Sequence, residues 1–153
     1  MATGEGVETT TPSVGSGHAV VAVGRRASNS RRISMDDIRL YAALSGDCNP
    51  VHLDDGYAAT TQFGRRIAHG MLVASLISAT LGNDLPGPGC LYLGQTLKFL
   101  APVFPDDTVT ATVEVIAIRP DKPIVTLRTT VTNQNGELVV DGEAVAKVPW
   151  LKA

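Results

Sequence analysis

The run from residue 68 to residue 81, AHGMLVASLISATL, constrains the fold most strongly. It has the length of a helix and is apolar on almost every side, and helices of that kind are usually buried in a protein core. Gly82 and Asn83 follow it, and either can take the left-handed conformation that ends a helix. The sequence therefore predicts one long buried helix, around which the other elements must pack.

The chain after that helix has the pattern of an antiparallel sheet. Residues 108–118 and 124–132 alternate between apolar and polar positions and are rich in β-branched side chains. An Asn-Gly pair at 135–136 separates the second of these runs from residues 138–148, which is the strongest short signal for a hairpin. Residues 91–101 alternate less regularly and predict a further strand. A long helix followed by such strands indicates an α+β fold whose sheet curls around the helix. The outer strands of such a sheet stay open, which favours pairing with a second subunit.

Shorter elements are expected ahead of the long helix. Runs at 18–23 and 27–33 suggest two strands. Ser34, followed by acidic residues, predicts the start of a helix that ends at Ser45-Gly46, and residues 57–61 suggest one or two further helical turns. The apolar stripe of the first helix is expected to consist of Ile38, Leu40, Tyr41 and Leu44.

A polar loop stands between these two helices. Asp47 and His52 lie five residues apart and are separated by Asn49-Pro50. Proline fixes its own φ and biases the preceding residue away from the helical region, so the segment should be a bent, well-defined loop. Such a loop can direct a carboxylate and an imidazole at one point.

Length, charge and cysteine content exclude several classes of protein. A chain of 153 residues suffices for one domain, expected over residues 18–153, while the Gly, Ser and Thr-rich residues 1–17 are expected to form a disordered tail. A net charge of −2 argues against nucleic-acid binding, and the longest apolar run is too short to span a membrane. Cys48 and Cys90 lie 42 residues apart, without metal or redox spacing, which fits a reducing compartment, so a cytoplasmic protein is expected. Arginine pairs among serines leave an organellar transit peptide open.

Several motifs resemble one known family. SGDCNPVH at 45–52 and FGRRIAHGML at 63–72 resemble the signature of MaoC-like (R)-specific enoyl-CoA hydratases. LYLGQ at 91–95, FLAPV at 99–103 and GEA at 142–144 are similar to that family as well. The motifs occur in the same order and spacing, so the resemblance is specific.

The resemblance, which extends over residues 33–149, implies a fold, an activity and a set of site residues. It implies a hotdog fold, a homodimer and the reversible hydration of trans-2-enoyl-CoA to (R)-3-hydroxyacyl-CoA, with short-chain members most similar. Asp47 and His52 correspond to the catalytic pair of the family, and Gly70 to the glycine whose amide polarises the thioester carbonyl. Ser78 matches a supporting serine. Acyl chain length and pathway, whether polyhydroxyalkanoate supply or fatty-acid metabolism, stay open.

The residues themselves fit this chemistry. Hydration of a conjugated thioester needs a base for water, an acid for the α-carbon and a donor for the enolate oxygen. Asp47 and His52 can hold one water between them, which predicts syn addition. The Gly70 N–H lies at a helix start, where amides are unpaired and the helix dipole is positive. Considered alone, Asp47 is as readily a turn-stabilising residue, and His52 a loop histidine bonded to the backbone.

Other residues near the loop have plainer interpretations. His69 is expected to orient or pack rather than to act as acid or base, and Cys48 lacks the neighbouring base of a nucleophile. Arg65-Arg66 is either a solvated pair or a contact for CoA phosphates. The acidic and histidine spacing matches no familiar metal site, so neither metal nor cofactor is predicted.

The acyl pocket is expected to run beside the long helix. If the carbonyl lies at Gly70, the helix wall passes Met71, Ser75 and Ser78 and reaches Leu81, which would limit chain length. The alternatives are that Leu81 packs only against the sheet, and that each serine bonds back to a helix carbonyl. Two rival functions remain: a hotdog thioesterase, and an acyl-CoA-binding subunit without catalysis.

Overall fold

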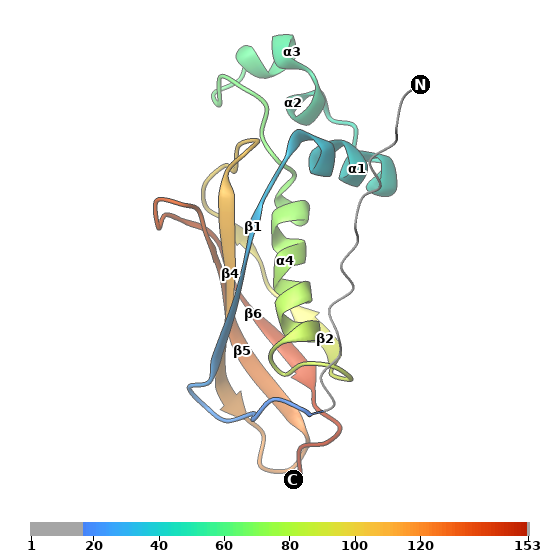
Figure 1. The fold of residues 1–153 in the computed structure, drawn as a ribbon, viewed down its shortest axis with the longest axis vertical. Helices are drawn as coiled ribbons and strands as arrows, with labels where there is room; N and C mark the ends of the chain where they lie inside the picture. Colours follow the sequence, from blue (N-terminus) through green and yellow to red (C-terminus); the bar gives the residue numbers. More distant parts are fainter. Residues whose placement is uncertain (1–16, 153) are drawn as a thin grey trace, which may run out of the picture.

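A single six-stranded antiparallel sheet and one long helix organise the protein. The computed structural model describes residues 17–152 (Figure 1). The strands follow the order β1-β4-β5-β6-β2, with the short β3 also paired to β6. The elements are β1 (Arg26–Arg32), α1 (Met35–Ser45), α2 (Pro50–Leu53), α3 (Asp55–Ala59), α4 (Gly70–Asn83), β2 (Leu91–Gln95), β3 (Lys98–Phe99), β4 (Thr108–Ile118), β5 (Ile124–Thr132) and β6 (Leu138–Lys147).

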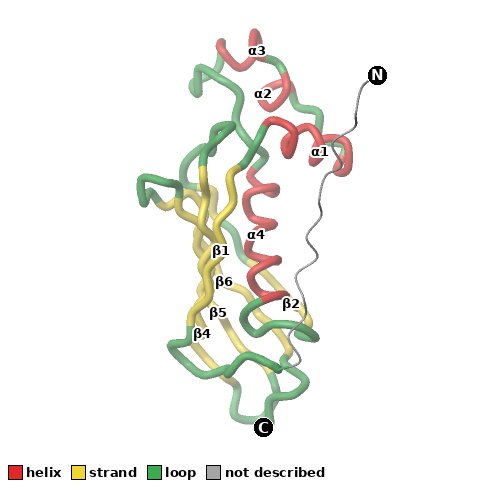
Figure 2. The backbone as a smooth tube through the Cα atoms, in the orientation of Figure 1, coloured by secondary structure: helices red, strands yellow, loops and turns green. Residues whose placement is uncertain are grey.

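The core lies between α4 and the concave face of the sheet, as the predicted α+β architecture requires. Alternate residues of β4 and β5 point inward and are fully buried, among them Val113 and Leu127. From α4, Val73, Ile77 and Leu81 meet them. Each such side chain stabilises the fold by roughly 1.5–3 kcal/mol through its removal from water. Figure 2 shows the sheet on one side of α4 and the shorter helices grouped beyond its first turn.

The helix α4 is not buried on every side, which corrects the prediction. Met71, Ser75 and Ser78 recur at helical spacing and are exposed. Their stripe faces away from the sheet, beside the edge strand β2. The hydroxyls break the apolar pattern on this face, so the helix has one inner face and one open face.

The helix α1 begins and ends as predicted, but its apolar stripe is different. Ser34 and Asp37 form a reciprocal capping box, and Gly46 ends the helix with a φ of 80°. Ile38 and Ala42 are buried, whereas Leu40 and Leu44 are 70% and 85% exposed. Only one narrow side of α1 therefore contacts the core.

The strand predictions hold where the alternation is regular. β4 and β5 have the predicted bounds, β6 ends one residue early, and Gly136 turns the hairpin with a φ of 75°. The strand expected at 27–33 is β1, whereas residues 18–23 form no strand. The run at 91–101 is divided into β2 and β3, with a register shift between Tyr92 and Gly94.

Other expectations bear on the termini and on membranes. The predicted disordered tail lies outside the described residues except for Gly17. Within residues 17–152, no helix has the length and apolar character needed to cross a membrane.

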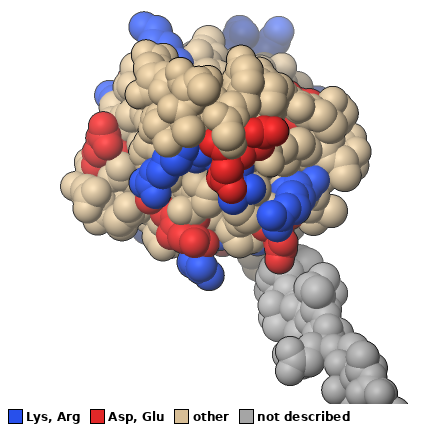
Figure 3. All heavy atoms as spheres, turned by 90° about the horizontal axis from the view of Figure 1, so that it is seen from above, with Lys and Arg blue, Asp and Glu red and all other residues tan. Residues whose placement is uncertain are grey.

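At the end of the molecule that carries α2 and α3, basic and acidic side chains intermingle (Figure 3). This face therefore offers no continuous basic surface to a nucleic acid.

Candidate active site

Local capping interactions build the segment that carries the acidic and imidazole side chains. Asn49 accepts a hydrogen bond from the Val51 N–H, and Pro50 occupies the first turn of α2. The predicted bent loop therefore includes one helical turn, because proline at this position starts a helix as readily as it bends a loop. His52 lies on that turn, five residues beyond Asp47.

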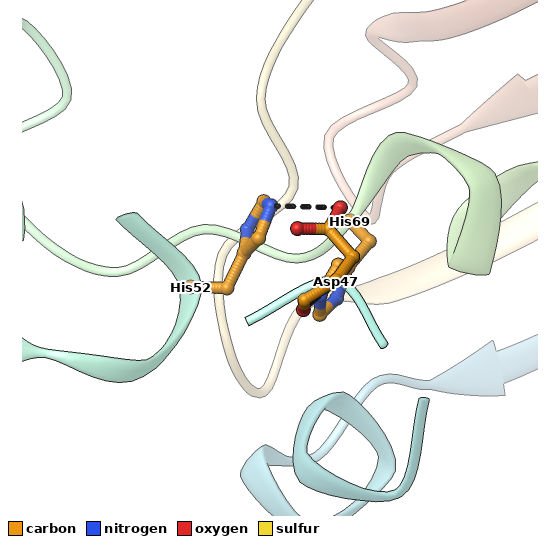
Figure 4. Close-up of side chains that lie close together, drawn as sticks. All are labelled: Asp47, His52 and His69. Carbon is orange, nitrogen blue, oxygen red and sulfur yellow. Dashed lines mark hydrogen bonds and ion pairs between the residues drawn. The ribbon is translucent and has the colours of Figure 1, made fainter. Parts of the chain in front are cut away.

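His52 is buried, and its tautomer follows from its hydrogen bond. Its ring Nδ1 lies 2.8 Å from the carbonyl oxygen of Ile67. A carbonyl only accepts, so Nδ1 carries the proton and Nε2 holds a free lone pair. Figure 4 shows Nε2 directed at the carboxylate of Asp47. His52 is therefore set as a proton acceptor on the side that faces Asp47.

Asp47 presents one carboxylate oxygen to this lone pair. Its Oδ1 accepts a hydrogen bond from the Asn49 N–H at 3.2 Å, and its Oδ2 lies 4.0 Å from Nε2 of His52. That separation is too long for a direct hydrogen bond, and both atoms are acceptors. A water with bonds of ~2.8 Å to both atoms across this 4.0 Å gap would have an angle of about 90° at its oxygen, near its own geometry. The pair is therefore built to accept two hydrogen bonds from one water.

The surroundings favour the neutral form of His52. Burial lowers the pKa of His52 below its ordinary value of 6.5, and the neighbouring His69 acts in the same direction. The hydrogen bond to Ile67 and the Asp47 carboxylate oppose this shift. Because the net effect lowers the pKa of His52, the imidazole stays a neutral base at pH 7.

Gly70 brings a backbone donor to the same place. It is the first residue of α4, so its N–H has no acceptor within the helix. Gly70, Asp47 and His52 line one cavity. A side-chain carbon at position 70 would lie 2.8 Å from the Phe99 ring, which explains why the position needs glycine. The sequence predicts glycine here because a thioester must approach closely. The nearby Phe99 ring is a second reason.

This cavity has a volume of about 430 Å³ and a mostly apolar wall. Met71 lines it, as predicted, whereas Ser78 and Leu81 do not. Ser78 faces the open side of α4, and Leu81 is 1% exposed within the core. The remaining wall comes from Tyr41, Phe63, Ile67, Ala68, His69, Val73, Phe99, Leu100, Ala101, Pro102, Val103, Val139 and Val140.

Sequence reasoning did not identify the part of this wall contributed by the sheet. Phe99 and Val140 belong to β3 and β6 and are paired in register. Both follow ordinary strand patterns, and no local signal distinguishes a cavity wall from a core position. Only the pairing of β3 with β6, across forty residues of sequence, brings them beside α4.

His69, expected from the sequence to orient or pack, lies directly against the pair. Its ring packs against the His52 ring, with centroids 3.8 Å apart and planes inclined by 31°. Asp47, His52 and His69 each offer a ligand atom within 4.8 Å of the others. One nitrogen of each ring is hydrogen-bonded to a backbone carbonyl, so each histidine has a single nitrogen left to offer an ion. The absence of a metal stays a prediction.

The remaining candidates lie apart from the cavity lining. Arg66 pairs with Asp55 at 2.7 Å, and Arg65 lies over the Phe104 ring at 3.9 Å. Cys48 is exposed, with a free thiol.

Comparisons with known proteins agree with this architecture. The sequence model of the MaoC-like domain matches residues 19–136. The chain belongs to the MaoC-like family. Within that family, it is 56% identical over 127 residues to the (R)-specific enoyl-CoA hydratase of Aeromonas caviae, covering 83% of this chain and 95% of that protein. The enzyme of the same name from Rhodospirillum rubrum is 55% identical over 126 residues, covering 82% and 87%.

Solved structures give the fold of this MaoC-like protein. The A. caviae (R)-hydratase, described as involved in PHA biosynthesis, superposes with a TM-score of 0.82 at 55% identity. The match covers 84% of this chain and 98% of that one. The predicted hotdog fold is therefore confirmed.

Proposed function

We propose that this MaoC-like protein catalyses the reversible, (R)-specific hydration of short-chain trans-2-enoyl-CoA to (R)-3-hydroxyacyl-CoA. The observation that carries the proposal is the 4.0 Å gap between two facing acceptors, Asp47 Oδ2 and His52 Nε2, on the wall of an apolar cavity. The (R) configuration is supported by the names of relatives more than 50% identical to this chain.

In this mechanism, Asp47 and His52 act together on one water. As the water oxygen bonds to the β-carbon, the pair takes one of its protons, and the thioester becomes an enolate. The pair then returns a proton to the α-carbon. One hydrogen and one hydroxyl are added, and both side chains end as they began. Because both acceptors lie on one side of the substrate, the addition is syn.

The start of α4 stabilises the enolate. The Gly70 N–H donates to the thioester oxygen, and the helix contributes about half a positive charge at this end. Loss of one such donor typically lowers kcat by roughly 10²–10³-fold. The acyl chain lies against the apolar wall that includes Met71, Val73 and Val140.

One assay separates this function from its rivals. The full-length protein is incubated with crotonyl-CoA while enoyl absorbance and free thiol are followed in parallel. Hydration removes the absorbance without releasing thiol, whereas a thioesterase releases thiol. An acyl-CoA-binding subunit without catalysis changes neither signal and would overturn the proposal. Dehydrogenases specific for each enantiomer then identify the product, and oxidation by the (S)-specific enzyme alone would contradict the assignment.

A homodimer is also proposed, formed through the edge strand β2 and the open face of α4. Leu91, Tyr92 and Leu93 of β2 are 51%, 40% and 54% exposed, and an unpaired apolar edge is a template for a second strand. Met71 of α4 lines one hollow with Tyr92 and Leu93. Two copies paired through β2 make a self-complementary interface. The opposite edge, β1, carries Arg26, Arg31 and Arg32, which disfavour such pairing.

The dimer is tested by its mass in solution. Light scattering should give twice the 16.0 kDa chain mass, and Leu93→Lys should lower it toward one chain. Ile116→Lys, at a 41% exposed apolar position on β4, is the matched control and should stay dimeric. A monomeric wild type would contradict this assembly.

The free thiols of Cys48 and Cys90 support a reducing, cytoplasmic location.

A further inference from the structure

We propose that His69 is a positioning residue that sets the distance between Asp47 and His52. It does so by fixing the Asp47 main chain to the start of α4 and by supporting one face of the His52 ring. The inference rests on the hydratase function proposed above. It adds to that function a third side chain that acts through Asp47 and His52.

The first support is a long-range hydrogen bond to an otherwise locally bonded segment. His69 Nε2 lies 2.9 Å from the carbonyl oxygen of Asp47. A carbonyl only accepts, so Nε2 carries the ring proton. Among the hydrogen bonds of residues 17–152, the others made by positions 46–49 join residues no more than four apart. His69 alone therefore ties this segment to the helix that supplies the Gly70 amide.

The second support is the contact of the His69 ring with two neighbouring rings. His69 is 2% exposed and lies between two other rings. The His52 ring of α2 packs against it with centroids 3.8 Å apart and planes inclined by 31°, and the Tyr41 ring of α1 lies at 4.8 Å with planes inclined by 56°. His52 is also held by the bond to Ile67, so two contacts fix its ring plane. The same His69 ring thus fixes the backbone of one partner and the ring of the other.

The third support is an unpaired nitrogen. With the proton on Nε2, the buried Nδ1 of His69 is an acceptor with no hydrogen-bond partner among the described residues. Burying an unsatisfied polar atom is unfavourable for folding, and an apolar ring would avoid it. Packing alone therefore does not call for an imidazole here. The Nε2–H donor explains the histidine, because a displacement of about 1 Å in a catalytic group can cost roughly 10²-fold in rate.

Variants at position 69 separate the donor from the ring. His69→Gln places an amide donor near the position of Nε2, whereas His69→Asn places it near Nδ1, one methylene short. His69→Phe keeps an aromatic ring and removes the donor. We expect His69→Phe and His69→Asn to lower kcat for crotonyl-CoA by about 10-fold to 100-fold, with KM changed less than about 2-fold. The Gln variant should recover much of that kcat. The unfolding temperature of His69→Phe should equal or exceed that of the wild type.

Several results would overturn the proposal. Wild-type kcat in folded His69→Phe would do so, as would equal losses in the Gln and Asn variants, or a rise in KM alone. Should the Phe variant fail to fold, the Gln and Asn pair still decides. Imidazole ¹⁵N spectra of the free wild-type protein give an activity-independent readout. They should show the Nε2–H tautomer for His69 and Nδ1–H for His52, and the reverse for His69 would contradict the inference. A wild type without hydratase activity would instead overturn the proposed function and leave the tautomer result standing.

Discussion

The segment from α1 to α3 and the frame of α4 with its sheet are built in different ways. The segment is held by short-range caps, such as the Ser34–Asp37 box and the Asn49 cap, and much of its surface is exposed. The frame is held by burial of apolar side chains contributed from distant parts of the chain. Asp47 and His52 come from the segment, as does the wall residue Tyr41, whereas Gly70, Val73 and Val140 come from the frame. Side-chain chemistry can therefore be removed from the segment with little loss of stability, while changes in the frame lower stability first.

The largest expected effect on activity comes from removing the reacting side chains of the segment. Asp47→Asn and His52→Gln should each lower kcat by roughly 10²-fold or more, the usual scale for a lost acid or base. Asp47 is exposed and His52 makes one hydrogen bond, so both variants should remain folded. The measurements are crotonyl-CoA kinetics and circular dichroism. Near-normal hydration by either folded variant would remove that residue from the mechanism.

A change in the frame should show the opposite pattern. Leu81→Ala removes a core side chain that is 1% exposed, and such truncations cost about 2–5 kcal/mol in the free energy of unfolding. Because Leu81 does not line the cavity, the milder Leu81→Val should leave the relative kcat/KM for four-, six- and eight-carbon substrates unchanged. Urea unfolding and kinetics measure the two effects. A shift toward longer substrates would restore the chain-length role predicted from the sequence.

A smaller effect is expected at the first cap of the segment. Ser34→Ala removes the hydrogen bond from the Asp37 N–H to the serine hydroxyl, which typically costs ~1 kcal/mol. Activity at 25 °C should stay near normal, since the cap lies at the far end of α1 from Asp47. Ser30→Ala, in β1, serves as a serine control whose hydroxyl caps no helix. Equal losses of stability in both variants would argue against a special role for the cap.

The smallest effect concerns pH. Protonation of His52 Nε2 removes one of the two acceptors, so kcat/KM should fall in acid. Because the pKa of His52 is lowered in the folded state, this fall should lie below pH 6.5. The unfolded chain binds the proton more readily, so the free energy of unfolding should also decrease as pH drops through and below 6.5. His52→Gln should lose this part of the pH dependence of stability. A kinetic pKa above 6.5 would contradict the assignment.

Features that depend on local sequence are the easier ones to predict. Their signals lie within a short stretch of sequence, because they depend on neighbours a few residues away. Examples are the loop with Asp47 and His52, the Ser34 N-cap and the Gly46 C-cap. Leu40, Leu44 and the open face of α4 were predicted as buried because periodicity records that a side chain is apolar, not what covers it. His69 could be placed near the pair but not oriented, because its partner, the Asp47 carbonyl, lies 22 residues away. The sheet part of the cavity wall needed the register of β3 with β6.

The stereochemistry of water addition across the double bond decides whether Asp47 and His52 act on one water. If one water is held between Asp47 and His52, hydroxyl and hydrogen reach the substrate from the same side. Crotonyl-CoA is hydrated in D₂O to low conversion, and proton coupling constants of the product locate the deuterium at the α-carbon. We expect one product, with deuterium and hydroxyl added to the same face. Addition to opposite faces, or a mixture of both α-deuterated products, would contradict it.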